Sequence, residues 1–449
     1  MSSESESTLI DSRFWNRCFQ VAGPALGLAI GLFLPASYQA PGGELLPVEI
    51  TIRVTLGALA CMATWWLTQC LPMWLTALVP LLLFPLTGVS TLDRIAAAYV
   101  DPTIRLFLAG FLLSAAIARW GLGQRFSLLV LRAVGSRPRN LVAGLMLVTA
   151  VVSAFVSNAA TTAIMLPIAV SLVVLVREQR ADSAAAAEAF GTCCLLGIAY
   201  AASIGGLATL LGSPPNLLLA GFLKSLPESA GRVELTFVRW LGIGVPLTLV
   251  VLPICWWLLT CQLFRLPLER VPAAEKAVAE RLRELGPLSP GELATLCSFG
   301  LAVTLWIFSP WLKSLEIPWG GNPVQPFGWL SDWLAGSLAA GLLCIYPVSH
   351  RPLFFTEIAS NTATVATALP IFGALAETWN MPAVYLAVPI TIAASCAFML
   401  PVGTPPNAIV FASGLVSSRD MIRAGWWLNW VCIGVIALLS NTLIEWFVI

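Results

Sequence analysis

The sequence predicts an all-α membrane protein that crosses the bilayer many times. Hydrophobic residues make up 58% of its 449 residues and charged residues only 10%, whereas soluble domains average roughly 45–50% and about 25%. A soluble chain of this length would need a charged surface that this composition cannot supply. Apolar runs of about 16–25 residues without two-residue alternation exclude a β-barrel and indicate helices.

Twelve apolar segments are expected to form the membrane helices. Eight are continuous, near 14–36, 53–71, 73–88, 103–118, 240–263, 292–311, 330–347 and 424–446. Four are interrupted by Ser, Asn, Gly or Pro, at 140–176, 193–223, 352–376 and 383–416. Lipid cannot satisfy free backbone N–H and C=O groups, so irregular backbone at this depth must be buried in protein or line a wet cavity. The four interrupted segments are therefore where a site is expected.

Charge divides the chain into two halves. The polar residues 1–13 lack the basic region and cleavage site of a signal peptide and are expected to form a disordered tail. Residues 14–263 and 291–449 are the halves, and 264–290 links them. The linker carries the largest group of charges, with Leu and Val at roughly helical spacing, which is typical of an interfacial amphipathic helix. A solvated loop is the alternative.

Two motifs occur once in each half, in the same order. Ser157–Ile168 aligns with Ser360–Ile371, with eight of twelve positions identical. Downstream, Gly-Ser-Pro-Pro-Asn at 212–216 matches Gly-Thr-Pro-Pro-Asn at 403–407. Two different motifs repeated in order predict an internal repeat.

The motif chemistry favours neutral oxygen ligands. Ser and Asn are strong N-cap residues, and a restarted helix presents free N–H groups and a positive dipole end to an anion. Two adjacent prolines remove two amide donors and free carbonyls upstream, which suits a hard monovalent cation such as Na⁺. None of the four motifs contains an acidic or basic residue, which argues against a proton-coupled carrier.

The doubled motifs resemble the divalent anion:sodium symporter family, most strongly over 140–223 and 354–416. The resemblance implies two inverted-type repeats, each with a re-entrant hairpin and a broken helix, and a homodimer in which a transport domain moves as an elevator against a scaffold domain. It implies sodium-coupled transport of C4-dicarboxylates (succinate, malate or fumarate), with no organic cofactor, no transition metal and no nucleic acid partner. The expected location is a bacterial inner membrane, with a cytoplasmic N-terminus.

The resemblance also assigns site residues. Two sodium sites would use, in the first half, Ser153, Ser157, Asn158 and Gly212, and in the second, Thr356, Ala359, Asn361 and Gly403. The substrate would lie between the motifs, against Asn158, Ala159, Ser213, Pro214, Ser360, Asn361, Thr362, Thr404 and Pro405.

This sequence departs from the family pattern in two places. Ala159 stands where the family has Thr, so one hydroxyl is absent from the first motif. Only thirteen positions separate Pro347 from Ser360, too few for another span and a hairpin arm. A scaffold helix and most of that arm are therefore expected to be missing, unless the span at 330–347 is misassigned. The distribution of Arg and Lys favours a single crossing at 352–376 over a hairpin.

Other functions remain open at this stage. A sulfate or citrate carrier, or a dicarboxylate exchanger, would fit the same motifs. A transport-dead relative acting as a sensor would fit the shortened second half. An intramembrane enzyme would need a base beside Ser157 or Ser360, and the single histidine, His350, lies at a predicted membrane edge. We therefore expect a carrier and not an enzyme.

Overall fold

Helices dominate the protein. The computed structural model describes residues 3–39, 45–68, 70–99, 101–179, 184–228, 232–266, 269–319, 322–345, 369, 376, 381–399 and 404–447. Strands in these ranges form two short antiparallel hairpins, β1 (Ser37–Gln39) with β2 (Leu45–Pro47) and β3 (Ile317–Trp319) with β4 (Asn322–Val324). The all-α class is confirmed. The chain separates into two units, Met1–Ile104 and Arg105–Ile449.

Glycines allow the two long helices of the first unit to pack closely. This unit contains α1 (Ser3–Phe33), α2 (Ile50–Thr68), α3 (Met73–Ala77), α4 (Val79–Leu86) and α5 (Leu92–Ala98). A Cβ atom added at Gly27 would lie 2.4 Å from the carbonyl oxygen of Gly57, and one at Gly57 would lie 2.6 Å from that of Gly27. Small residues at such a crossing let helix backbones approach in a membrane.

Helix α1 begins at Ser3. The disordered tail expected over 1–13 remains a prediction. The single span expected over 73–88 is divided at Leu78 into α3 and α4. Pro80 explains this division, because it lacks the N–H that would continue the helix from α3.

The second unit contains the remaining helices and both sequence motifs. Its helices up to the linker are α6 (Pro102–Trp120), α7 (Leu122–Val134), α8 (Pro138–Ser153), α9 (Asn158–Gln179), α10 (Ala184–Gly205), α11 (Pro214–Ser225) and α12 (Phe237–Trp257), which continues as the π-helical turn η2 (Leu258–Leu263). After it come α13 (Pro272–Glu284), α14 (Pro290–Lys313), α15 (Asp332–Ile345), α17 (Val384–Ser395), α18 (Pro405–Ala412) and α19 (Ser418–Phe447).

Several helices are long enough to cross a bilayer. Within the described ranges seven qualify by length and hydropathy: Ile50–Thr68, Pro102–Trp120, Asn158–Gln179, Ala185–Gly205, Phe237–Leu263, Pro290–Lys313 and Ser418–Leu439. A helix of about 20 apolar residues spans the hydrocarbon core. The prediction of a polytopic membrane protein is confirmed.

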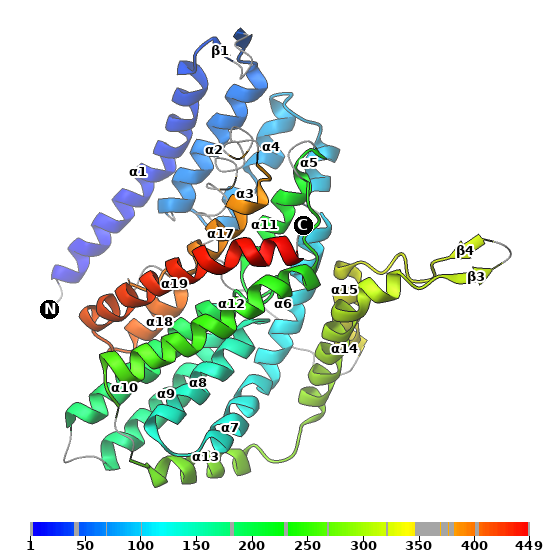
Figure 1. Ribbon diagram of the computed structural model, residues 1–449. Helices are drawn as coiled ribbons and strands as arrows, with labels where there is room; N and C mark the ends of the chain where they lie inside the picture. The colour runs from blue at the N-terminus through cyan, green and yellow to red at the C-terminus, as the bar shows by residue number, and fades with distance from the viewer. Residues whose placement is uncertain are drawn as a thin grey trace. The chain divides into compact units, whose positions relative to one another are not determined.

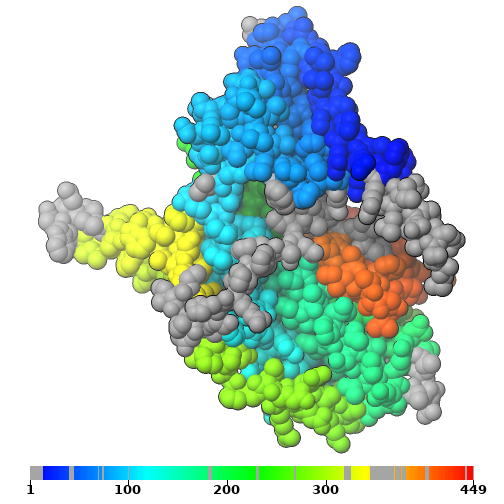
Figure 2. Space-filling view, turned by 180° about the vertical axis from the view of Figure 1, so that it is seen from behind, coloured from blue at the N-terminus to red at the C-terminus, as the bar shows by residue number. Residues whose placement is uncertain are grey.

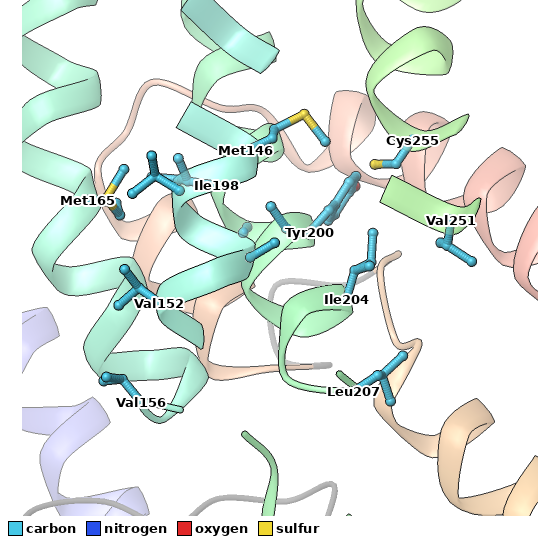
Figure 3. Close-up of a cluster of buried hydrophobic side chains, with 14 of the residues drawn as sticks. Met146, Val152, Val156, Met165, Ile198, Tyr200, Ile204, Leu207, Val251 and Cys255 are labelled. Atoms are coloured by element: carbon cyan, nitrogen blue, oxygen red, sulfur yellow. The ribbon is translucent and has the colours of Figure 1, made fainter. Parts of the chain in front are cut away.

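The core of the second unit surrounds α10. This helix is the most buried of the candidate spans, with 89% of its apolar window inside the protein, and α8, α9 and α12 pack against it. Figure 3 shows Ile198, Tyr200 and Ile204 of α10 among side chains such as Met146 of α8 and Val251 of α12. A helix that is apolar on all sides and buried on all sides is held in one place. The polar break that follows α10 is therefore anchored to the core.

The interrupted segments break at the predicted motifs. Four residues, 154–157, separate α8 from α9, and an unwound segment, 206–213, separates α10 from α11. In the second half α17 ends at Ser395 and α18 begins at Pro405. Helix α10 packs against α18, and α11 packs against α17 (Figure 1). Because the first part of each broken helix contacts the second part of the other, the two broken helices run antiparallel and their breaks lie side by side, as inverted repeats require.

The linker contains a helix and not only a loop. Helix α13 buries Ala274 and Val278, packs against α7 and α9, and exposes its charged residues. This part of the linker is therefore amphipathic, and its interfacial position remains a prediction. Arg125 of α7 forms an ion pair with Glu292 of α14 at 2.7 Å, which holds the two sides of the linker together. Beyond α14, the β3–β4 hairpin projects away from the α14–α15 pair (Figure 2).

One topological question falls outside the described residues. Helix α15 shows that the span expected at 330–347 is helical. The single crossing expected at 352–376 lies in ranges that the structure does not describe, apart from Leu369 and Ala376. It remains a prediction.

Candidate functional site

The tip of the α8–α9 hairpin is built by local capping. Ser157 precedes α9, and its hydroxyl accepts a hydrogen bond from the N–H of Ala160 at 3.3 Å, as an N-cap does. The hydroxyl of Thr162 donates to the carbonyl of Asn158 at 2.8 Å. The helix restart that the Ser-Asn motif predicted is therefore present, and it directs the positive end of a 22-residue helix toward the tip.

Asn158 joins the hairpin tip to the first broken helix. In the orientation that places its carboxamide nitrogen among hydrogen-bond acceptors, that nitrogen lies 2.7 Å from the hydroxyl of Ser153, 3.1 Å from the carbonyl of Ala202 and 3.2 Å from the carbonyl of Gly212, which share its two N–H groups. The hydroxyl of Ser153 in turn donates to Ala202 at 2.8 Å. Three residues predicted for the first sodium site, Ser153, Asn158 and Gly212, are thus brought into one hydrogen-bonded cluster.

Carbonyl oxygens from two elements converge at Gly212. A Cβ atom added there would lie 2.7 Å from the carbonyl oxygen of Gly206, 2.8 Å from that of Ser153 and 2.9 Å from that of Ala154. No side chain fits among these oxygens, which explains the glycine. The arrangement is a group of neutral oxygens at the junction of the hairpin tip and the break.

Thr209 is a residue of this junction that the sequence motifs did not identify. Its hydroxyl donates a short hydrogen bond to the carbonyl of Ala154 and accepts bonds from the N–H groups of Leu211 and Gly212, both at 3.1 Å. The side chain is buried, with 2% of its surface exposed. Thr209 therefore ties the unwound segment to the hairpin tip.

The motif asparagines act as donors. The carboxamide nitrogen of Asn216 donates to the carbonyls of Gly206 at 2.9 Å and Thr209 at 2.8 Å. That of Asn407 donates to the carbonyl of Ala397 at 3.1 Å. Their nitrogens thus face carbonyls of the unwound segments, while the carboxamide oxygen of Asn216 is buried and accepts no hydrogen bond. Each Asn supplies N–H donors where the two prolines before it supply none.

The two breaks restart their second helices in the same way. Ser213 and Thr404 are N-caps with φ/ψ of −145°/133° and −142°/151°, each followed by Pro at the first helical position. Thr404 accepts from the N–H of Asn407 at 3.4 Å, whereas Ser213 makes no capping bond. Pro214 and Pro405 therefore occupy equivalent positions. Six residues predicted for the second half of the site lie outside the described residues: Thr356, Ala359, Ser360, Asn361, Thr362 and Gly403.

The described part of the site carries no acidic or basic side chain. Residues 153–162, 202–216 and 391–407 contain no Asp, Glu, Lys, Arg or His, and no cluster of three His, Cys, Asp or Glu occurs within the described part of the chain. Ser157, Asn158 and Ala159 are half-buried, while Ser213 and Thr404 are buried. Neutral oxygens with helix N-termini suit a monovalent cation and an anion.

Comparisons with known proteins agree with this chemistry. A family described as citrate transporters matches residues 63–343, and one described as the sodium:sulfate symporter transmembrane region matches residues 322–449. The sodium-dependent dicarboxylate transporter SdcS of Staphylococcus saprophyticus is 31% identical over 484 aligned positions, which cover 94% of this chain and 90% of the relative. That of Staphylococcus aureus is 30% identical over 478 positions, covering 93% and 89%.

The alignment with the Staphylococcus saprophyticus transporter also shows a difference in length between the two chains. The 484 aligned positions outnumber the 449 residues of this chain, so the relative has residues within the matched region that this chain lacks. These matches place the protein among membrane transporters and not among enzymes. The chain belongs to the divalent anion:sodium symporter family.

Proposed function

We propose that the protein is a sodium-coupled secondary transporter of small divalent anions, with C4-dicarboxylates such as succinate, malate and fumarate as substrates. The observation that carries the proposal is the neutral junction where the hairpin tip meets the first break. Carbonyl oxygens of Ser153, Ala154 and Gly206 converge there beside Gly212. The relatives at about 30% identity are named as sodium-dependent dicarboxylate transporters, which supports the same substrate class.

The first sodium ion would bind at this junction, which is assigned to Ser153, Ser157, Asn158 and Gly212. Hydroxyl and carbonyl oxygens of these residues are ligands that a hard cation prefers, while the carboxamide nitrogen of Asn158 faces the carbonyl of Gly212. Because the site has no carboxylate, a bound Na⁺ leaves a net positive charge. That charge attracts an anion, and the N-terminus of α9 adds to the attraction.

The second sodium ion would bind at the equivalent place in the second half. The repeat assigns it to Thr356, Ala359, Asn361 and Gly403. The antiparallel packing of α10 with α18 and of α11 with α17 supports this assignment, since it sets the two breaks side by side. Two cations flanking one site would balance the two charges of a dicarboxylate.

The substrate would lie between the motifs of the two halves. The residues facing it would be Asn158, Ala159, Ser213, Pro214, Ser360, Asn361, Thr362, Thr404 and Pro405. Ser213 makes no capping bond, so its hydroxyl remains for a ligand. Ala159 offers no hydroxyl, so the first half has one donor fewer than the second, where Thr362 stands. A missing hydrogen bond to a carboxylate costs about 1–3 kcal/mol.

Sulfate and citrate are the second candidates. The match of residues 322–449 to the sodium:sulfate symporter region and of residues 63–343 to the citrate transporter family favours them, and exchange of two dicarboxylates fits the same site. The proposed assembly is a homodimer in a bacterial inner membrane with a cytoplasmic N-terminus, in which the hairpin and broken helices move together as an elevator. Movement as one body fits the bonds that join Asn158 to Ala202 and Gly212.

A thermal-shift panel tests the substrate class. The purified protein is melted with succinate, malate, citrate or sulfate, each in sodium chloride and in choline chloride of equal ionic strength. We expect succinate and malate to raise Tm only when sodium is present. Stabilisation by sulfate alone would assign the protein to sulfate, and equal effects in choline would contradict sodium coupling.

A further inference from the structure

Two side chains outside the assigned sodium ligands hold the oxygens that converge at Gly212. The carboxamide of Asn216 donates to the carbonyl of Gly206 at 2.9 Å, and the hydroxyl of Thr209 donates to the carbonyl of Ala154. These are two of the three carbonyls that surround the Cβ position of Gly212. The third carbonyl belongs to Ser153, at the end of α8.

Both side chains also form hydrogen bonds with backbone groups of the unwound segment. The second N–H of the Asn216 carboxamide reaches the carbonyl of Thr209 at 2.8 Å. The Thr209 hydroxyl, besides donating, accepts from the N–H groups of Leu211 and Gly212 at 3.1 Å. A hydroxyl has one donor and two acceptor positions, and a carboxamide nitrogen has two donors. Every one of these positions is used, so Thr209 and Asn216 form a closed clamp across the unwound segment.

The second broken helix contains the same carboxamide contact. Asn407 donates to the carbonyl of Ala397, ten residues earlier, just as Asn216 donates to that of Gly206, ten residues earlier. In both halves two prolines precede the asparagine and contribute no N–H. The same asparagine-to-carbonyl hydrogen bond therefore spans the break in both halves.

We infer that Thr209 and Asn216 are positioning residues that set the spacing of the carbonyl oxygens at the first sodium site, and thereby its preference for Na⁺ over Li⁺ and K⁺. A carbonyl oxygen that accepts one hydrogen bond keeps a second lone pair for a cation. The clamp fixes where that lone pair lies without touching the ion. This inference rests on the proposed function, because it concerns the same cation site.

The test is a cation titration of the full-length protein in detergent, read by thermal shift in Na⁺, Li⁺ and K⁺ at constant ionic strength. Thr209→Val keeps the side-chain shape and removes the hydroxyl, whereas Thr209→Ser keeps the hydroxyl and removes the methyl group. Asn216→Leu removes the carboxamide at similar volume. Thr295→Val is the matched control, because Thr295 is equally buried and its hydroxyl bonds only to Gly291, within α14.

We expect Thr209→Val and Asn216→Leu to raise the half-saturating Na⁺ concentration about ten-fold. We also expect them to bring the half-saturating concentrations of Na⁺ and Li⁺ closer together. Thr209→Ser should stay near the wild type, and Thr295→Val should lower Tm without changing either quantity. A folded Thr209→Val protein with wild-type cation dependence would overturn the inference about the clamp and leave the proposed function standing. If the wild type itself shows no Na⁺ response, the proposed function fails and the clamp fails with it. If Thr209→Val does not fold, Asn216→Leu decides in its place, since a folded Asn216→Leu protein with wild-type Na⁺ and Li⁺ dependence would overturn the inference.

Discussion

The carboxamide nitrogen of Asn158 lies 2.7 Å from the hydroxyl oxygen of Ser153, so the first residue of α9 is tied to the last residue of α8. The same carboxamide reaches the carbonyls of Ala202 and Gly212. One side chain thus holds the hairpin tip, the end of the buried helix α10 and the break that follows it. A substitution there affects the proposed cation and anion sites together.

Asn158→Ala should abolish sodium-driven uptake. The change removes the contacts to Ser153, Ala202 and Gly212. The carbonyl of Ala202 keeps its bond from Ser153, whereas that of Gly212 loses this donor, at a cost of about 1–3 kcal/mol. Asn361→Ala should do the same in the second half. Uptake by proteoliposomes measures both. Asn140→Ala serves as the control, because Asn140 is exposed and bonds only to Val134; transport retained in Asn158→Ala would remove this residue from the site.

Gly212→Ala should eliminate stabilisation by sodium. The added methyl group would lie 2.7–2.9 Å from three carbonyl oxygens, so those oxygens would have to separate. Gly434→Ala is the matched control, since a Cβ at Gly434 meets nothing within 4 Å. The measurement is the rise in Tm on replacing choline with sodium. An undiminished rise in a folded Gly212→Ala protein would show that the carbonyls at this glycine do not bind the ion.

Ala159→Thr should strengthen dicarboxylate binding relative to sulfate. Ala159 is the second residue of α9 and half-buried, and a hydroxyl there would restore the pattern of the second half. One recovered neutral hydrogen bond contributes about 0.5–1.5 kcal/mol, or roughly two- to twelve-fold in affinity. Competition of succinate and sulfate for uptake measures the ratio. A ratio that is unchanged, or that moves toward sulfate, would count against a substrate contact at this position.

Glu292→Gln should destabilise the protein without altering its sodium response. Glu292 and Arg125 form a bidentate pair at 2.7 and 3.0 Å, with only 5% and 11% of their side chains exposed. Removing one partner of a buried pair costs about 3–5 kcal/mol. Glu284→Gln is the control, because the Arg281–Glu284 pair is 65% exposed on both sides and should contribute at most about 1 kcal/mol. Equal Tm changes in the two variants would contradict the structural role of Arg125 and Glu292.

Residues 377–382 should lie on the non-cytoplasmic side. A single crossing over 352–376 has about 25 residues, enough to span the hydrocarbon core, and keeps Arg351 and Arg419 on one side. In a background without native cysteines, Glu377→Cys should react with an impermeant maleimide added outside the cell, and Glu280→Cys in α13 should not. Labelling of Glu377→Cys only after permeabilisation would show that the segment is a hairpin opening inward.

Local sequence signals predicted the breaks well, because their causes are local. Paired prolines remove N–H groups, and Ser-Asn caps a new helix, whatever the rest of the chain does. The tie between Thr209 and Ala154 could not be predicted in this way, because it joins residues 55 positions apart. A threonine in an apolar segment most often bonds one turn back, as Thr149 and Thr391 do here. Its role follows only from the folded arrangement.

The hydrogen bonds of Asn216 also could not be predicted from the sequence. The sequence identifies an amide beside two prolines, but an amide offers both an oxygen and a nitrogen. Which one faces the carbonyls depends on where the unwound segment places Gly206 and Thr209.

Sodium-driven succinate uptake into proteoliposomes tests the central claim most directly. Vesicles with reconstituted protein are diluted into buffer with an inward sodium gradient, with no gradient, or with a potassium gradient, and labelled succinate inside is counted. The account predicts accumulation above the external concentration with the sodium gradient only. Equal uptake under all three conditions, or none in a protein that sodium stabilises, would contradict sodium-coupled dicarboxylate transport.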